Sequence, residues 1–324
     1  MDYSMNTAVY AVIIAFLANI VLCPMLIPAL RRLKFGQQIR GDGPQTHLRK
    51  AGTPTMGGII IVISFLLAAA VFMRDNPHAM VVTLTTLGFS ALGFLDDFIK
   101  VVKKRSLGLR AWQKFAGQIV IALAFWMRWR SLPGYTTEIL IPFFPELTFD
   151  VGLLFPIFVV LVFLSSTNGA NLTDGLDGLA AGVTAIIAVF FMFAAWILGS
   201  SVLPVAGAAV GSLMGFLLFN SYPARIFMGD TGSIALGGFV AAIALILQMP
   251  LFLLIVAIVY VVESLTVIMQ VTYFRLTGGK RIFPMTPIHH SFEMIGWPET
   301  KIVAFFSVVT AMACLLGYLA IMGV

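Results

Sequence analysis

The chain has 324 residues, of which 60% are hydrophobic, and it carries 20 Lys and Arg against 14 Asp and Glu, a net charge of +6. Charged residues make up 10% of the chain, against about 25% in soluble domains, which excludes a soluble globular protein of this size. The high content of hydrophobic residues also excludes an intrinsically disordered chain. The two cysteines, Cys23 and Cys314, lie in apolar runs near opposite ends, which excludes a disulfide framework or a cysteine zinc site. The composition indicates an all-α integral membrane protein.

Apolar runs between polar breaks predict ten membrane-spanning helices in one polytopic domain over residues 1–324, because about 20 apolar residues cross a bilayer core. In chain order the predicted spans are 7–30, 56–73, 79–95, 113–129, 151–166, 179–198, 203–219, 234–249, 250–274 and 302–322. The first span is not a cleavable signal peptide, since its basic residues follow the apolar run. Met249-Pro250 alone separates the eighth span from the ninth.

The basic residues divide unequally between the two faces of this arrangement. Seventeen of the 20 fall in loops after odd-numbered spans, and the other face holds Arg74, Arg128 and Arg130. By the positive-inside rule, the loops with more basic residues are cytoplasmic and both termini are extracytoplasmic. This topology explains the net charge, so no nucleic-acid partner is expected.

Two lysines stand at the starts of predicted spans on the cytoplasmic face. Lys50 opens the segment Lys50-Ala51-Gly52-Thr53-Pro54-Thr55-Met56-Gly57-Gly58, and Lys114 lies at the start of the fourth span. Both are placed to reach into a cleft. Other clustered cations, such as those of 103–105, are explained by anionic lipid headgroups.

The third span ends in the adjacent carboxylates Asp96 and Asp97. The two ionised carboxylates repel each other. A divalent cation such as magnesium, which prefers oxygen ligands, relieves this repulsion. A solvated helix end with Lys100 and Lys103 as ordinary partners explains the pair equally well.

Polar side chains recur at every third residue of the segment 168–178, namely Asn168, Asn171, Asp174 and Asp177. On a helix, side chains three residues apart lie on progressively different faces, so these four would not form one stripe. The glycines of this segment instead favour a turn-rich stretch, whose backbone amides suit an anionic ligand. A purely structural turn is the alternative, and the terminal Glu of an EF-hand is absent.

The segment 220–233 begins with Asn220 and ends with Gly229-Asp230-Thr231-Gly232-Ser233 before an apolar run. This pattern predicts a helix entry, where free amides attract anions. Asp230 as a plain N-cap is the alternative. Phe227 is either a platform for base stacking or an aromatic residue of the membrane interface.

The last predicted cytoplasmic loop holds His289 and His290, followed by Glu293. A histidine near a phosphate donates hydrogen bonds or moves a proton. A loop held by contacts between histidine and Glu293 is the alternative. Glu263, inside the ninth span, is expected to face the bundle interior and is given no chemical role.

Taken together, these carboxylates, turns, histidines and lysines lie on one predicted face, and phosphoryl transfer needs such a set. A site at the cytoplasmic face implies one soluble phosphorylated substrate and one lipid-borne substrate. Three segments, 94–97, 171–179 and 227–233, resemble motifs of the polyprenyl-phosphate N-acetylhexosamine-1-phosphate transferases. Two more, 50–58 and 287–290, resemble its phospho-N-acetylmuramoyl-pentapeptide transferase branch.

This resemblance implies transfer of phospho-N-acetylmuramoyl-pentapeptide from UDP-N-acetylmuramoyl-pentapeptide to undecaprenyl phosphate. The products would be lipid I and UMP, in peptidoglycan synthesis at the bacterial cytoplasmic membrane. It also implies Mg2+ as cofactor, and membrane lipids and a homodimer as further partners. The alternative within the superfamily is transfer of N-acetylglucosamine-1-phosphate for teichoic acid or O-antigen. A transporter or flippase is disfavoured, because the acids crowd one interface and no internal repeat is evident.

The resemblance also assigns roles to residues. Asp96, Asp97, Asp230 and His289 would be catalytic, with Asp230 as the magnesium ligand and Asp96 accepting the proton of the lipid phosphate. A covalent phospho-enzyme on one Asp is the alternative. The substrate would be bound by Lys50, Thr55, Lys114, Asn168, Asn171, Asp174, Asp177, Asn220, Phe227 and His290. Ser291 stands where the family usually has a third histidine, which leaves proton transfer to the other two.

Overall fold

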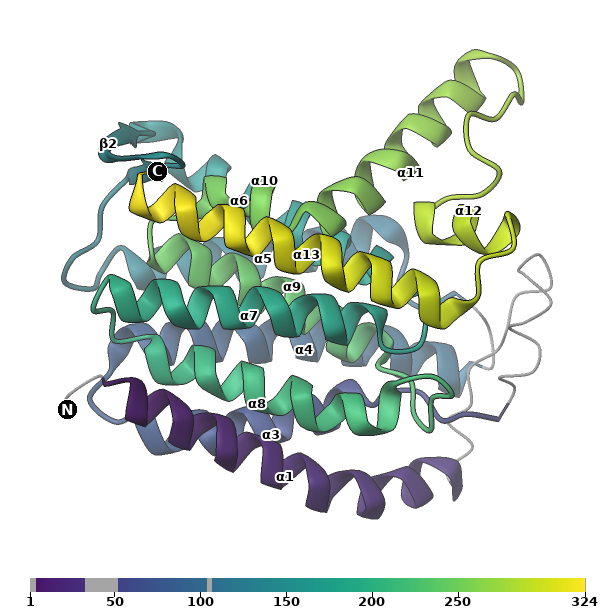
Figure 1. Ribbon diagram of the computed structural model, residues 1–324, viewed down its shortest axis with the longest axis horizontal. Helices are drawn as coiled ribbons and strands as arrows, with labels where there is room; N and C mark the ends of the chain where they lie inside the picture. The colour runs from purple at the N-terminus through teal and green to yellow at the C-terminus, as the bar shows by residue number, and fades with distance from the viewer. Residues whose placement is uncertain (1–3, 33–51, 104–106, 324) are drawn as a thin grey trace.

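Helices occupy all ten ranges in which apolar runs predict a span, and the computed structural model arranges them as one bundle (Figure 1). The structure describes residues 4–32, 52–103 and 107–323. The ten helices are α1 (Met5–Arg32), α3 (Gly58–Phe72), α4 (Pro77–Val102), α5 (Ala111–Trp129), α6 (Phe155–Thr173), α7 (Leu179–Ile197), α8 (Leu203–Asn220), α9 (Gly229–Ile246), α11 (Ile258–Leu276) and α13 (Glu299–Met322). The shorter elements are η1 (Gly152–Leu154), η2 (Pro250–Phe252), α10 (Leu253–Val256) and α12 (Ile288–Met294).

Within the described ranges, eight helices are long and apolar enough to cross a membrane, so the chain is a multi-pass membrane protein. α3 is apolar but has 15 residues, and polar side chains, Gln113, Lys114, Gln118 and Arg128, lower the hydropathy of α5. The count of ten spans therefore stays a prediction. The start of α1 and the end of α13 lie at the same end of the bundle, on the left in Figure 1, as an even number of spans requires.

The expectation of an all-α fold misses a β-hairpin at this same end. Strands β1 (Glu138–Ile141) and β2 (Phe144–Asp150) pair antiparallel, with Glu138 opposite Asp150. The hairpin is attached to the helices by its backbone, because Leu140 N donates to Gln248 O over 2.7 Å and Phe143 N donates to Ala320 O over 3.0 Å. It therefore ties together the ends of α9 and α13.

The predicted ninth span, 250–274, is interrupted. Pro250 begins the short helix η2, and Ala257, with φ −102° and ψ 30°, separates α10 from α11. After this break α11 leans away from the bundle (Figure 1). Its buried residues share one face and are Val259, Tyr260, Glu263, Thr266 and Gln270.

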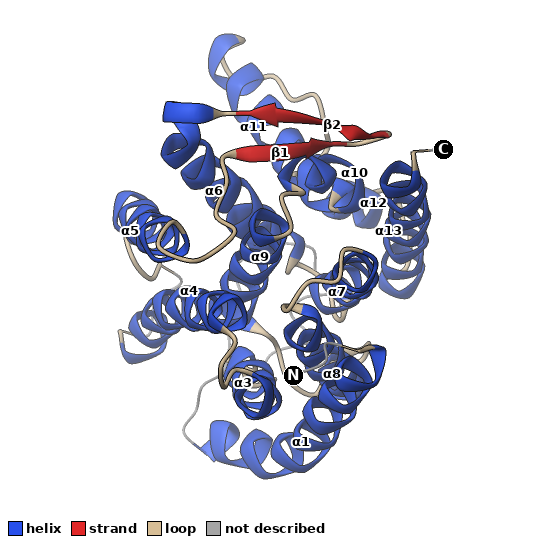
Figure 2. Ribbon diagram, turned by 90° about the vertical axis from the view of Figure 1, so that its left-hand side faces the viewer, coloured by secondary structure: helices blue, strands red, loops and turns tan. Residues whose placement is uncertain are grey.

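Helix α9 lies in the middle of the bundle, with α4, α6 and α7 around it (Figure 2). Fifteen of its 18 residues are buried, and many of them are Gly or Ala, which lets neighbouring backbones approach closely. One of the two closest approaches to α9 is at Gly93 of α4, where an added Cβ would lie 2.1 Å from the backbone oxygen of Asp230; Gly58 of α3 comes equally close to Gly232 N. Gly93 therefore brings the last turn of α4 against the first turn of α9.

We expect Gly93→Ala to lower the stability of the protein, because a methyl group forces α4 and α9 apart, and overpacking costs about 1–3 kcal/mol. The measurement is the midpoint of thermal unfolding in detergent. Gly88→Ala on the same helix is the matched control, since its Cβ would meet the flexible side chain of Ile121 at 3.3 Å. Equal midpoints for the two variants would contradict the close contact.

Candidate active site

The contact between α4 and α9 is completed by the side chain of Asp97. Its carboxylate accepts hydrogen bonds from Thr231 N over 2.8 Å, from Thr231 Oγ1 over 2.7 Å and from Asp230 N over 3.2 Å. These amides belong to the first turn of α9, which has no partners for them within the helix. Asp97 thus caps α9 from a neighbouring helix, and Asp230 is not the N-cap, because it lies inside the first turn.

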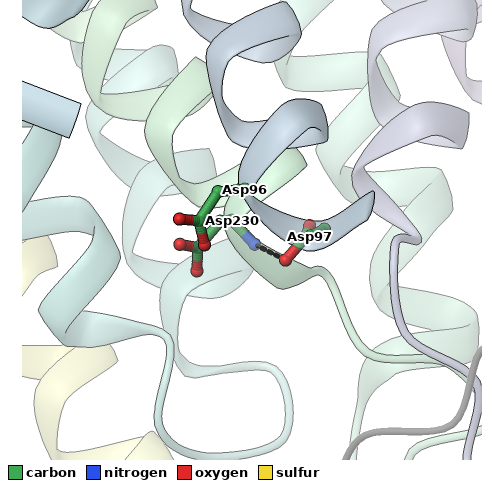
Figure 3. A group of neighbouring side chains, drawn as sticks. All are labelled: Asp96, Asp97 and Asp230. Carbon is green, nitrogen blue, oxygen red and sulfur yellow. Dashed lines mark hydrogen bonds between the residues drawn. The ribbon is translucent and has the colours of Figure 1, made fainter. Parts of the chain in front are cut away.

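Asp96 and Asp230 lie side by side, whereas Asp97 points to the other side (Figure 3). Lys100, one turn further along α4, joins the pair, because its Nζ lies 2.6 Å from Asp96 Oδ2 and 3.1 Å from Asp230 Oδ2. The same Nζ lies 3.6 Å from Asp97 Oδ1. Asp96 Oδ1 also accepts a hydrogen bond from Leu109 N over 2.8 Å.

Helices α5 and α6 add a lysine and an amide to this group. Lys114 Nζ donates to Asp230 Oδ2 and to Asn171 Oδ1, each over 2.9 Å. Asn171 Nδ2 in turn donates to Asp230 Oδ1 over 3.0 Å. One turn deeper, Asn168 Nδ2 donates to Gln118 Oε1 over 3.0 Å. Asn168 therefore supports the contact between α5 and α6 and is not among the partners of Asp230.

The expectation of a turn-rich stretch over 168–178 is wrong in its first half. Helix α6 continues to Thr173, and the turn is limited to the residues between Asp174 and Gly178. The helix places Asn171 and Asn168 roughly one turn apart, toward α5. Burial, followed by the charges of Asp230 and Asp97, raises the pKa of Asp174 to about 8.

Asp177 and Asn220 hold the loop that leads into α9. Asp177 Oδ2 accepts from Ala224 N over 2.9 Å, and Asp177 N donates to Glu299 Oε1 over 2.6 Å. Asn220 Nδ2 donates to Ile226 O over 2.9 Å. These contacts shape the loop that precedes Asp230.

Phe227 pairs with the segment before α3 through its backbone. Phe227 N donates to Pro54 O, and Gly57 N donates to Phe227 O, each over 2.8 Å. Thr55 lies within this pairing, and its Oγ1 would be 3.0 Å from a Cβ added at Gly229. Thr55 and Phe227 therefore lie beside the entry to α9. Lys50 lies outside the described residues.

The two histidines are attached to different acids. His289 and Glu263 are both fully buried, and His289 Nδ1 lies 3.0 Å from Glu263 Oε1. The other ring nitrogen of His289 lies against Gly175, where an added Cβ would come within 2.1 Å of Nε2. His290 Nδ1 lies 2.7 Å from Glu293 Oε2. Glu263 does face the bundle interior, as expected. Through its contact with His289, it connects α11 to the turn that follows Asp174.

Lys100 is the main residue of the site to which the sequence assigned no special role. Its spacing from Asp96 and Asp97, four and three residues, was the available signal, because residues at these distances share a helix face. The same spacing describes an ordinary ion pair at a helix end. What distinguishes Lys100 is the additional contact with Asp230 from α9.

Carboxylate oxygens of Asp96, Asp97 and Asp230 lie within 4.8 Å of one another, close enough to hold a metal ion. The oxygens of Asp97 already accept three hydrogen bonds from α9. Asp96 and Asp230 instead face Lys100 and Lys114, so this part of the site already attracts cations. Hard oxygen donors of this kind fit Mg2+.

Comparison with known proteins gives matches along nearly the whole chain. Residues 79–248 match the model of glycosyl transferase family 4, and residues 50–62 match the phospho-N-acetylmuramoyl-pentapeptide-transferase signature 1. A phospho-N-acetylmuramoyl-pentapeptide-transferase of Acetivibrio thermocellus is 48% identical, over 99% of this chain and 97% of the relative. Proteins of the same name from Clostridium kluyveri and Clostridium botulinum are 46% and 47% identical, over 98% and 97% of this chain and 100% and 97% of the relatives.

The raised pKa of Asp174 predicts a pH dependence of stability. Between the ordinary pKa of 3.8 and about 8, the folded protein keeps a proton that the unfolded chain releases. The free energy of unfolding therefore falls as the pH rises through this window, by at most about 1.4 kcal/mol per pH unit. We expect Asp174→Asn to remove this contribution.

The measurement is the unfolding midpoint of both proteins between pH 5 and pH 8 in metal-free detergent buffer. The midpoint of the wild type should fall relative to that of the Asn variant as the pH rises. A constant difference across this range would contradict the raised pKa.

Proposed function

The chain belongs to the phospho-N-acetylmuramoyl-pentapeptide-transferase family, within glycosyl transferase family 4, and from this membership we propose its reaction. It transfers phospho-N-acetylmuramoyl-pentapeptide from UDP-N-acetylmuramoyl-pentapeptide to undecaprenyl phosphate. The products are lipid I and UMP, and the reaction belongs to peptidoglycan synthesis. The match to the signature over residues 50–62 favours this reaction over transfer of N-acetylglucosamine-1-phosphate.

The observation that carries the proposal is the convergence of Asp96, Asp230, Lys100 and Lys114 at one end of the bundle. These residues come from α4, α5 and α9; Lys100 contacts both Asp96 and Asp230, and Lys114 contacts Asp230. Phosphoryl transfer depends mainly on positioning and on neutralisation of charge, and this group supplies cations and carboxylates together. The end of the bundle that carries the group is opposite the end with both termini and the hairpin.

In the reaction, an oxygen of the lipid phosphate attacks the donor phosphorus that carries the sugar. A new bond joins the two phosphates, and the bond between that phosphorus and the oxygen of UMP breaks. Asp96 takes the proton of the lipid phosphate. We assign this role to Asp96 because Asp97 is occupied by α9, which also disfavours a covalent intermediate on Asp97.

Asp230 would hold Mg2+, which would neutralise charge on the phosphate oxygens when bound. Lys100 and Lys114 lie next to this carboxylate and are positioned to bind the diphosphate of the donor. Asn171 fixes the carboxylate of Asp230 through its amide. The family's other assigned positions, Lys50, Thr55, Phe227, His289 and His290, would bind the nucleotide and the sugar-peptide.

The topology proposed with this function has ten spans, both termini on the extracytoplasmic side and the site at the cytoplasmic face of the bacterial cytoplasmic (inner) membrane. The distribution of Lys and Arg supports it, because 17 of the 20 fall in loops after odd-numbered predicted spans. This side meets the soluble donor, while the bundle gives the lipid acceptor access from the bilayer. A homodimer stays a prediction.

We expect Asp230→Asn to abolish transfer of labelled sugar phosphate to undecaprenyl phosphate, because the variant loses the charge that holds Mg2+, Lys100 and Lys114. The measurement is lipid I formation in detergent, with Mg2+ and with EDTA. The matched control is Asp150→Asn, the same substitution at an exposed position of β2 at the other end of the bundle. Near-normal turnover of a folded Asp230→Asn protein would refute the assignment of Asp230.

The choice of donor separates the two transferase functions. With undecaprenyl phosphate as acceptor, we expect UMP release from UDP-N-acetylmuramoyl-pentapeptide and little release from UDP-N-acetylglucosamine. Release that requires both Mg2+ and the lipid phosphate also distinguishes an enzyme from a flippase. Preferred use of UDP-N-acetylglucosamine would instead support the teichoic acid or O-antigen reaction.

A further inference from the structure

A carboxylate and an imidazole meet in the protein interior, where α12 packs against α11. Glu263 and His289 are both 0% exposed, and His289 Nδ1 lies 3.0 Å from Glu263 Oε1. In the part of the chain that the structure describes, no other cation pairs with this carboxylate. A buried carboxylate is costly unless a proton or a cation lies beside it, so the proton of the ring belongs on Nδ1. The proposed reaction gives Glu263 no role.

The Glu263 carboxylate stands on a part of α11 that is fixed to the bundle. Tyr260, three residues earlier on the same buried face, is hydrogen-bonded through its hydroxyl to Thr184 of α7. An added Cβ at Gly169 of α6 would lie 2.8 Å from the Cβ of Tyr260, so the two helices are in close contact there. Helix α11 therefore holds Glu263 at a defined place relative to α6 and α7.

The second nitrogen of His289 faces the turn between α6 and α7. A Cβ at Gly175 would lie 2.1 Å from Nε2, so the position requires a residue without a side chain. Gly175 directly follows Asp174, one of the positions expected to bind the donor. The imidazole is thus held between Glu263 on one side and this turn on the other, and Nε2 is directed to the segment that carries Asp174.

The neighbouring histidine has a carboxylate partner of another kind. His290 Nδ1 lies 2.7 Å from Glu293 Oε2, and this ion pair joins two residues of the same helix. The contact between His289 and Glu263 instead joins α12 to α11. Helix α12 has seven residues and is too short to be stable alone, so its orientation depends on contacts with other elements.

We propose that Glu263 is a positioning residue for His289. Its carboxylate keeps the proton on Nδ1 and leaves Nε2 as the nitrogen that meets the donor, as the buried Asp of a Ser-His-Asp triad does for its histidine. The inference rests on the proposed function, which assigns His289 to binding of the donor. It also supplies a chemical reason for an ionisable residue within a membrane helix, where a carboxylate is otherwise costly.

The first test is a double-mutant cycle in kcat/KM for UDP-N-acetylmuramoyl-pentapeptide, with the full-length protein in detergent. We expect Glu263→Gln to lower kcat/KM about 10–100-fold, the range seen when the outer partner of a metal-bound histidine is removed. In a His289→Gln background the same substitution should change kcat/KM less than about twofold, because a residue that acts through His289 has no effect without it. Thr266→Val, on the same buried face of α11, is the matched control and should leave kcat/KM unchanged.

The second test observes the ring directly, by NMR of protein labelled with nitrogen-15 histidine and assigned with the His289→Gln variant. We expect the wild-type signals of His289 to be those of a ring protonated at Nδ1, and Glu263→Gln to shift them. Unchanged ring signals in a folded Glu263→Gln protein would overturn the proposal. An equal loss of kcat/KM in both backgrounds would also overturn it, because a purely structural role of Glu263 does not depend on His289.

Failure of the proposed function gives a different result, because the wild type would then not release UMP from the pentapeptide donor. The role of Glu263 toward the donor would be overturned with it, whereas the ring signals would still report the contact between Glu263 and His289. Normal release of UMP together with unchanged ring signals would overturn the positioning role alone.

Discussion

The carboxylate of Asp97 accepts hydrogen bonds from the first turn of α9, so each group supplies the partner that the other lacks. A carboxylate at 4% exposure is costly without hydrogen bonds, and so are helix amides without acceptors. Three hydrogen bonds remove both costs at once. Because Asp96 adjoins Asp97 in sequence and Asp230 lies in the capped turn, this contact also brings Asp96 and Asp230 together. The geometry of this group of carboxylates is therefore a consequence of how α9 is capped.

The charges around this contact are nearly balanced. Asp96, Asp97 and Asp230 face Lys100 and Lys114, which leaves one negative charge in excess. Such a group attracts a divalent cation without repelling a diphosphate strongly, since the lysines remain beside the carboxylates. In the proposed reaction the aspartates and the donor would compete for the same two lysines. Binding of the donor would then replace ion pairs that already exist in the structure.

Much of the fold and of the site could be predicted from local patterns. Apolar runs identified the ten helices, and Gly229-Asp230-Thr231-Gly232-Ser233 identified the start of α9. Contacts between distant segments could not be predicted this way. Lys100 looked like an ordinary partner of Asp96 until α9 brought Asp230 beside it. Asn168 matched Asn171 in residue type and spacing, yet it bonds Gln118 because α6 stays helical there. The hairpin was missed because its strands are short and lie between apolar spans.

The cap on α9 also has a consequence for the synthesis of the protein. Asp97 and Thr231 are 134 residues apart in the chain. At about 5–20 residues per second, Thr231 is synthesised roughly 7–27 s after Asp97. During this interval the carboxylates of α4 have no helix to cap, and water at the membrane surface must solvate them. The last turn of α4 can therefore be joined to α9 only after the four helices α5 to α8 have been synthesised.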